Sequence, residues 1–250
     1  MITNNQEEIV SILIKKGEKL LNKPRQRTLF TGNKAADDLL NNIKGYPHVY
    51  VLACIMDRQI KAEKAWIIPY KVSRETEGFE FSKLRSLTAD KIKKMFKTNN
   101  FHRFNKEMAN NFYQAIQKIH NDYGDDASRI WKDNPPSAVI VRRFLEFRGV
   151  GVKIATMAVN ILARDFKIPM KDHICIDISP DVHIRRVFQR LGFIPKEASV
   201  DEVIYCAREL NPEYPGIFDL SCWEIGRDWC RPNNPACKEC YLDKLCPKNI

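Results

Sequence analysis

Residues 147–155 read Phe-Arg-Gly-Val-Gly-Val-Lys-Ile-Ala and lie between two segments whose apolar residues have helical spacing. Gly149 and Gly151 permit positive φ angles and a close approach of another molecule to the backbone. The second helix is predicted to begin near Val152, where its free N–H groups and those of the turn form an anion site. An ordinary helix–helix turn would have a similar sequence, and a nucleotide P-loop is excluded because the turn is too short.

Lys153 lies two residues after Gly151, at the start of the predicted second helix. The helix dipole disfavours a cation at this position, and partial burial has the same effect. An amine held in its neutral form can act as a nucleophile. The position also suits a surface lysine that contacts phosphate, so both roles stay open at this point.

The rest of the chain is predicted to be all-α. Thr88 and Ser137 are predicted to cap helices, the second of which runs to Phe147. Apolar residues at helical spacing predict further helices over residues 6–21, 34–43, 49–66, 106–121, 152–166 and 180–191. Residues 70–87 are polar and aperiodic, which predicts a loop with one short element.

Asp181 opens the last of these helices, after Ser179 and Pro180. A carboxylate in a first helical turn is favoured by the dipole whatever else it does. We predict that the neighbouring His183 has a structural role and satisfies a local hydrogen bond.

Four of the eight cysteines lie in the last 21 residues with the spacing C-x6-C-x2-C-x5-C: Cys230, Cys237, Cys240 and Cys246. Four thiolates can hold a [4Fe–4S] cube. Structural zinc usually uses two C-x-x-C pairs, and only one is present here. The sequence therefore favours a structural iron–sulfur cluster over zinc. The other four are predicted to be small buried residues in a reducing compartment: Cys54, Cys175, Cys206 and Cys222.

The charge balance indicates an anionic partner. The 250 residues carry a formal net charge of +10 and are 44% hydrophobic. Nucleic acid, an anionic membrane surface and an ordinary basic protein without such a partner are all compatible with these values. No apolar stretch is long enough to span a membrane, and the N-terminus lacks the pattern of a secretion signal. The expected location is the cytoplasm, in association with the nucleoid, or the nucleus of a eukaryote.

Three features, in this order, resemble the endonuclease III-like branch of the helix-hairpin-helix DNA glycosylases: the hairpin with Lys153, the segment from Asp181 to His183, and the four-cysteine loop. The resemblance covers roughly residues 49–246. It implies two helical domains with a DNA-binding cleft between them and a C-terminal iron–sulfur loop. The implied domains are an N-terminal helix that packs with the C-terminal domain, a helical barrel that ends in the hairpin, a second helical domain and the cluster loop, over residues 1–33, 34–166, 167–229 and 230–250.

The resemblance also implies a base-excision-repair activity on double-stranded DNA that contains a damaged base or an abasic site. Lys153 would form a Schiff base with the sugar of a flipped-out nucleotide, and Asp181 would stabilise the positive charge that develops on that sugar. β-Elimination would then nick the strand. A monofunctional glycosylase, in which Asp181 activates water, and a non-catalytic reader of damaged DNA are the alternatives. We expect a monomer with no membrane partner.

Further site residues follow from the resemblance. Gly149, Val150 and Gly151 would contact the DNA backbone. Gln59 resembles the family's wedge glutamine, Arg58 would contact base edges, and Met56 and Asp57 would line the substrate pocket. An amphipathic helix whose polar face meets water is the alternative.

The chain also departs from the family pattern. The stretch between Lys153 and Asp181 is long, with an apparent insertion over residues 167–178. Arg148 stands where the family usually has proline, and Ala53 stands at the acidic position of adenine glycosylases. The sequence therefore does not identify the damaged base.

Overall fold

A computed structural model of the chain describes residues 3–249, and every regular element in this range is a helix. The prediction of an all-α chain is confirmed. Contacts divide the chain into two compact units: Met1–Pro24 with Pro136–Val141 and Val159–Ile250, and Arg25–Pro135 with Arg142–Ala158. We call them the terminal unit and the central unit. The four-part domain division drawn from the sequence stays a prediction.

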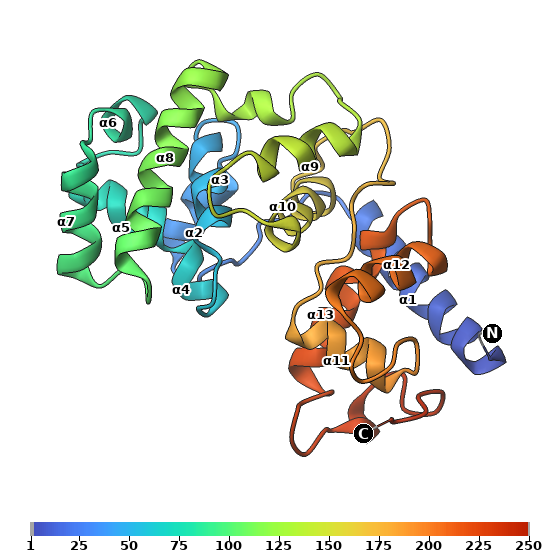
Figure 1. Cartoon of the computed structure of the whole chain (residues 1–250). Helices are drawn as coiled ribbons and strands as arrows, with labels where there is room; N and C mark the ends of the chain where they lie inside the picture. Colours follow the sequence, from blue (N-terminus) through green and yellow to red (C-terminus); the bar gives the residue numbers. More distant parts are fainter. Residues whose placement is uncertain (1–2, 250) are drawn as a thin grey trace. The chain divides into compact units, whose positions relative to one another are not determined.

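The central unit holds seven complete helices and a 3₁₀ turn: α2 (Lys34–Asn41), α3 (Pro47–Met56), α4 (Ala62–Trp66), α5 (Ile68–Glu75), α6 (Phe81–Arg85), α7 (Ala89–Asn99), α8 (Asn105–Tyr123) and η1 (Ala127–Ile130). Every residue of α3 is buried. Helices α7 and α8 pack along each other, as Figure 1 shows. The Tyr50 hydroxyl on α3 donates to the Ala158 carbonyl at 2.6 Å, which ties α3 to the helix that follows the glycine turn.

The terminal unit contains α1 (Asn4–Asn22), α11 (Val182–Arg190), α12 (Val200–Leu210), η2 (Pro215–Phe218), α13 (Asp219–Asp228) and η3 (Cys237–Glu239). Two helices, α9 (Ser137–Leu145) and α10 (Val152–Arg164), contribute residues to both units. Helix α11 packs against α13 (Figure 1). Capping boxes begin α1 at Thr3 and α12 at Ser199, where each side chain satisfies a backbone N–H that the helix itself leaves unpaired.

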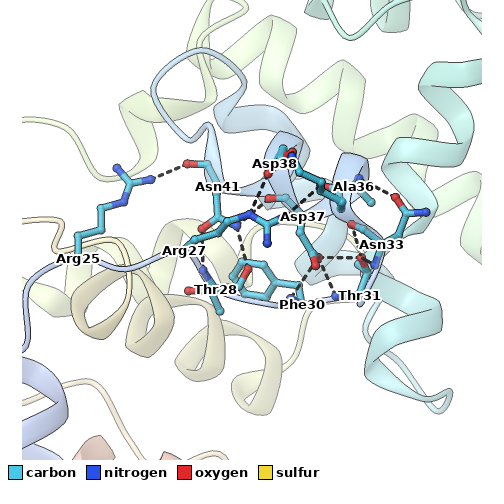
Figure 2. Close-up of polar contacts among 11 residues, drawn as sticks. Arg25, Arg27, Thr28, Phe30, Thr31, Asn33, Ala36, Asp37, Asp38 and Asn41 are labelled. Atoms are coloured by element: carbon cyan, nitrogen blue, oxygen red, sulfur yellow. Dashed lines mark hydrogen bonds and ion pairs between the residues drawn. The ribbon is translucent and has the colours of Figure 1, made fainter.

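A strap of residues 25–33 runs along α2 in the central unit (Figure 2). The Asp37 carboxylate is buried and accepts from the Thr31 N–H at 2.8 Å, the Thr31 hydroxyl at 2.7 Å and the Phe30 N–H at 3.2 Å. Asn41 exchanges two hydrogen bonds with the Thr28 backbone, each 2.9 Å long. The Asp37 and Asn41 side chains of α2 thus supply hydrogen-bond partners for backbone groups of this extended segment.

Three sequence predictions need correction. The helix predicted over residues 49–66 is broken into α3 and α4, since Asp57 leaves helical geometry with ψ 66°. Residues 70–87, predicted as a loop with one short element, overlap two helices, α5 and α6, because buried apolar residues stabilise helices too short to show a period. Thr88 caps α7 as predicted. Ser137 instead hydrogen-bonds the segment before α11, through Asp172 and the Cys175 N–H.

Candidate active site and cysteine loop

The glycine turn between α9 and α10 rests on α8. Gly149 has φ +85°, and a Cβ there would lie 2.4 Å from Nδ2 of Asn111, a buried α8 residue. Both the backbone and the space therefore require glycine at this position. The Val150 N–H donates to the Phe147 carbonyl at 3.1 Å, and the Phe147 side chain is buried.

The surroundings of Gly151 differ from those of Gly149. It is exposed, and apart from its chain neighbours and the backbone of α10, no heavy atom of residues 3–249 lies within 4 Å of the position that a Cβ would take. Packing within the chain therefore does not require glycine here. The first N–H groups of α10 have no acceptor within the helix. An external ligand thus has open access to the backbone at the start of α10.

Lys153 lies in the first turn of α10 and is half-buried. Within residues 3–249 its ammonium makes no hydrogen bond and no ion pair. The nearby Thr156 hydroxyl donates to the Val152 carbonyl at 3.0 Å. The amine is thus available to a partner outside the chain.

The turn between α3 and α4 holds the other predicted DNA contacts. Met56 is fully buried, and Asp57 is 9% exposed. Gln59 is exposed and has φ +55°, an unusual backbone for a residue other than glycine. The Arg58 guanidinium forms an ion pair with Glu107 of α8 at 2.6 Å.

Helix α8 supports both turns. Glu107, the partner of Arg58, and Asn111, which lies under Gly149, are four residues apart on α8. Residues at this spacing are neighbours on one face of a helix. Sequence analysis missed both, because each resembles the ordinary polar residues of an amphipathic helix. The structure thereby groups residues 56–59 and 149–153 on the central unit.

Asp181 belongs to the terminal unit and is the N-cap of α11. Its Oδ1 accepts from the backbone N–H groups of His183 and Ile184, each at 2.8 Å. Oδ2 makes no hydrogen bond within the described part of the chain. One oxygen therefore fixes the carboxylate, and the other remains available to a ligand. His183 has the expected local partner, since its Nδ1 lies 3.1 Å from Nη2 of Arg186.

A buried carboxylate lies next to the segment that leads to Asp181. Oδ1 of Asp219 accepts from the Ser179 N–H at 2.8 Å. Burial raises the pKa of Asp219 to about 6, although the Ser179 hydrogen bond and Arg164 act in the opposite direction. Sequence analysis did not select this residue. The available signal was a single acid in the otherwise apolar or small stretch 215–222.

The four C-terminal cysteines line one pocket in the terminal unit, together with Val187, Arg190, Leu191, Ile225, Trp229, Leu242, Asp243 and Lys248. Arg190 organises the loop, donating to the Cys230 sulfur at 3.4 Å and to the Arg231 carbonyl at 2.7 Å. Burial raises the pKa of the Cys240 and Cys246 thiols. The neighbouring cysteine sulfurs raise it further by a smaller amount. Cys54 and Cys222 are buried, whereas Cys175 and Cys206 are partly exposed.

No group of three or more His, Cys, Asp or Glu side chains in residues 3–249 is arranged to hold a single metal ion. Likewise, no helix in the described range is both long and apolar enough to cross a membrane.

Two curated proteins are similar to part of the chain. Endonuclease III of Thermotoga maritima is 33% identical over 107 residues, which are 42% of this chain and 45% of that protein. Endonuclease III-like protein 1 of Gallus gallus is 29% identical over 109 residues, or 43% of this chain and 36% of the relative. The match thus spans less than half the length of these relatives. No family model matches the chain.

Solved structures resemble the chain over nearly its whole length. A trapped covalent intermediate of endonuclease III with DNA has a TM-score of 0.65 at 16% identity, covering 100% of this chain and 98% of the other. A thermostable thymine-DNA glycosylase has a TM-score of 0.62 at 20% identity, covering 98% and 96%. The predicted resemblance to endonuclease III is confirmed, in sequence over part of the chain and in fold over all of it.

Proposed function

We propose that this protein is a base-excision-repair DNA glycosylase with an associated abasic-site lyase activity. The observation that carries the proposal is the start of α10. There Gly151 is exposed, and the space that a Cβ would take is open within residues 3–249. Two residues later comes Lys153, whose amine has no partner in the described chain. The similarity to endonuclease III supports it, and one structure of that fold holds the enzyme covalently bound to DNA.

In the proposed reaction, the target nucleotide leaves the base stack and Lys153 Nζ attacks its sugar at C1′. The bond between C1′ and the base breaks, and the base leaves with the bonding electrons and takes up a proton. Opening of the sugar gives a Schiff base between Lys153 and C1′. Oδ2 of Asp181 would stabilise the positive charge on the sugar and assist the proton transfers. β-Elimination then cleaves the strand on the 3′ side.

Double-stranded DNA is the proposed partner, bound in the nucleoid or the nucleus. Gly149, Val150 and Gly151 would contact the backbone of the damaged strand. Gln59 would enter the gap left by the flipped base, and an exposed side chain on an uncommon backbone conformation suits this role. Arg58 would contact base edges, and Met56 and Asp57 would line the pocket.

We further propose that a [4Fe–4S] cluster binds Cys230, Cys237, Cys240 and Cys246. The donor set fits, since all four residues line one pocket and Arg190 donates to the Cys230 sulfur. When bound, the cluster would supply four iron–thiolate bonds that hold the C-terminal loop in place. The proposed reaction uses none of these residues.

Borohydride trapping tests the proposal. Anaerobically purified protein is incubated with duplexes that carry an abasic site or one of several damaged bases, and covalent adducts are resolved on a denaturing gel. We expect an adduct with the wild type and none with Lys153→Ala. Base release without strand cleavage or adduct would identify a monofunctional glycosylase. Damage-specific binding without release of any base would indicate a non-catalytic reader.

A further inference from the structure

Helix α13 contacts the Asp181 segment at two points within the terminal unit. Its first residue, Asp219, accepts from the Ser179 N–H at 2.8 Å. Ser179 and Asp181 are themselves joined, since the Asp181 N–H donates to the Ser179 carbonyl at 2.7 Å. A continuous chain of hydrogen bonds thus leads from Asp219 to the backbone of the residue that caps α11.

The second contact lies about two turns further along α13. A Cβ at Gly226 would lie 2.7 Å from the His183 Cβ and 3.1 Å from the His183 carbonyl oxygen. The Gly226 carbonyl accepts from Arg186 Nη2 at 2.7 Å. Glycine therefore lets the α13 backbone pack directly against the first turn of α11, which contains both N–H groups that Asp181 caps.

The environment of Asp219 is charged as well as buried. Arg164 at the end of α10 attracts its carboxylate, and Arg164 is also paired with Asp165 at 2.7 Å. Asp181, which lies in the segment before α11, repels the Asp219 carboxylate. Asp219 also interacts electrostatically with the Tyr214 hydroxyl before η2 and with the Cys222 thiol on α13. Burying a carboxylate is unfavourable, and here only Ser179 and Arg164 offset part of the cost, so packing alone does not explain this residue.

We propose that α13 is the positioning element for the Asp181 carboxylate, with Asp219 as a positioning residue that fixes the Ser179 turn and Gly226 as the close contact that fixes the first turn of α11. This inference rests on the proposed function, in which Asp181 assists the reaction. Loss of either contact would let the cap shift without removing a group that touches DNA. A misplacement of about 1 Å costs on the order of a hundredfold in rate.

The test compares five variants with the wild type: Asp219→Ala, Asp219→Asn, Gly226→Ala, Asp181→Asn and Asp37→Ala. Asp37 is the matched control, because it is also a buried aspartate that accepts from loop backbone N–H groups, but it holds the strap on α2 (Figure 2). Each protein, loaded with any cluster it binds, is mixed in excess with a labelled abasic-site duplex. The readouts are the single-turnover rate of strand cleavage, the Kd for a duplex with an uncleavable abasic analogue, and Tm.

We expect Asp219→Ala and Gly226→Ala to slow cleavage about tenfold or more, with Kd within about threefold of the wild type. Asp37→Ala should lower Tm and leave the rate per folded molecule unchanged. Asp219→Asn, which keeps an acceptor oxygen, should recover most of the rate. If Asp219→Ala does not fold, Gly226→Ala and Asp219→Asn still give the comparison.

Two results would overturn the idea, and they are distinguishable. Wild-type cleavage by folded Asp219→Ala or Gly226→Ala, alongside a slow Asp181→Asn, would refute the positioning role and leave the proposed function standing. Wild-type cleavage by Asp181→Asn would refute the role of Asp181 itself.

Discussion

The Asp219 carboxylate makes the folding free energy depend on pH. Its pKa rises from 3.8 to about 6 in the folded chain because the group is buried. The folded state therefore binds a proton more tightly than the unfolded state, and this contribution to stability is complete below about pH 4 and is lost as the pH rises through about 6. The difference between the two values corresponds to about 3 kcal/mol at most.

Asp219→Asn should therefore stabilise the protein relative to the wild type above about pH 6.5, by up to about 3 kcal/mol, with a difference that shrinks towards pH 4. Urea unfolding at several pH values measures this directly. A variant less stable than the wild type at about pH 8 would show that the Ser179 hydrogen bond and Arg164 outweigh the cost of burying the charge.

At the scale of single elements, the two glycines of the turn before α10 should respond differently to substitution. Gly149→Ala meets both a left-handed backbone and a contact of 2.4 Å with Asn111. It should lower the free energy of unfolding by about 1–3 kcal/mol. Gly151→Ala meets no neighbour and should leave stability within about 0.5 kcal/mol. If the DNA backbone approaches Gly151 as proposed, the variant should nevertheless weaken DNA binding, because the added methyl group would face that backbone.

Chemical denaturation and fluorescence anisotropy with an abasic-analogue duplex separate these two effects. Equal losses of stability in both variants would argue that the turn is only a packing feature. An unchanged affinity in Gly151→Ala would remove this glycine from the proposed interface.

The sequence predicts elements well where one signal dominates. Thr88 caps α7 as predicted, because its hydroxyl accepts from the Lys91 N–H, one of the donors that the helix leaves unpaired. The break after α3 could not be predicted, since Asp57 and Gln59 are neither glycine nor proline and the backbone leaves the helix there with only unusual dihedral angles. The motif residues Gly149, Lys153 and Asp181 were visible in the chain. Their supports, Asn111 and Asp219, were not, because a supporting contact between distant segments leaves no local pattern.

For the molecule as a whole, the proposed cluster would link stability to metal content. If a [4Fe–4S] cluster is bound, Cys237→Ala should lose iron and the visible absorbance of the cluster, and its Tm should fall because the C-terminal loop loses its anchor. Metal analysis, absorption spectra and calorimetry on anaerobic protein measure these quantities. Zinc in stoichiometric amount, without iron, would contradict the proposed cofactor.

If the protein binds DNA as proposed, its net charge of +10 predicts that this binding depends strongly on salt. Each phosphate neutralised by the protein releases counterions, so the affinity for DNA should fall by at least about tenfold between 50 and 200 mM salt. In the proposed complex, Lys153→Ala should lower the slope of log Kd against log salt by about one, because it would remove one cation from the proposed interface. Gly151→Ala should weaken binding with the slope unchanged, because it removes none. Anisotropy titrations at four salt concentrations measure the salt slope of each variant and of the wild type. A slope that Lys153→Ala leaves unchanged would place this ammonium away from the phosphates and leave the reaction with the sugar as its remaining role on DNA.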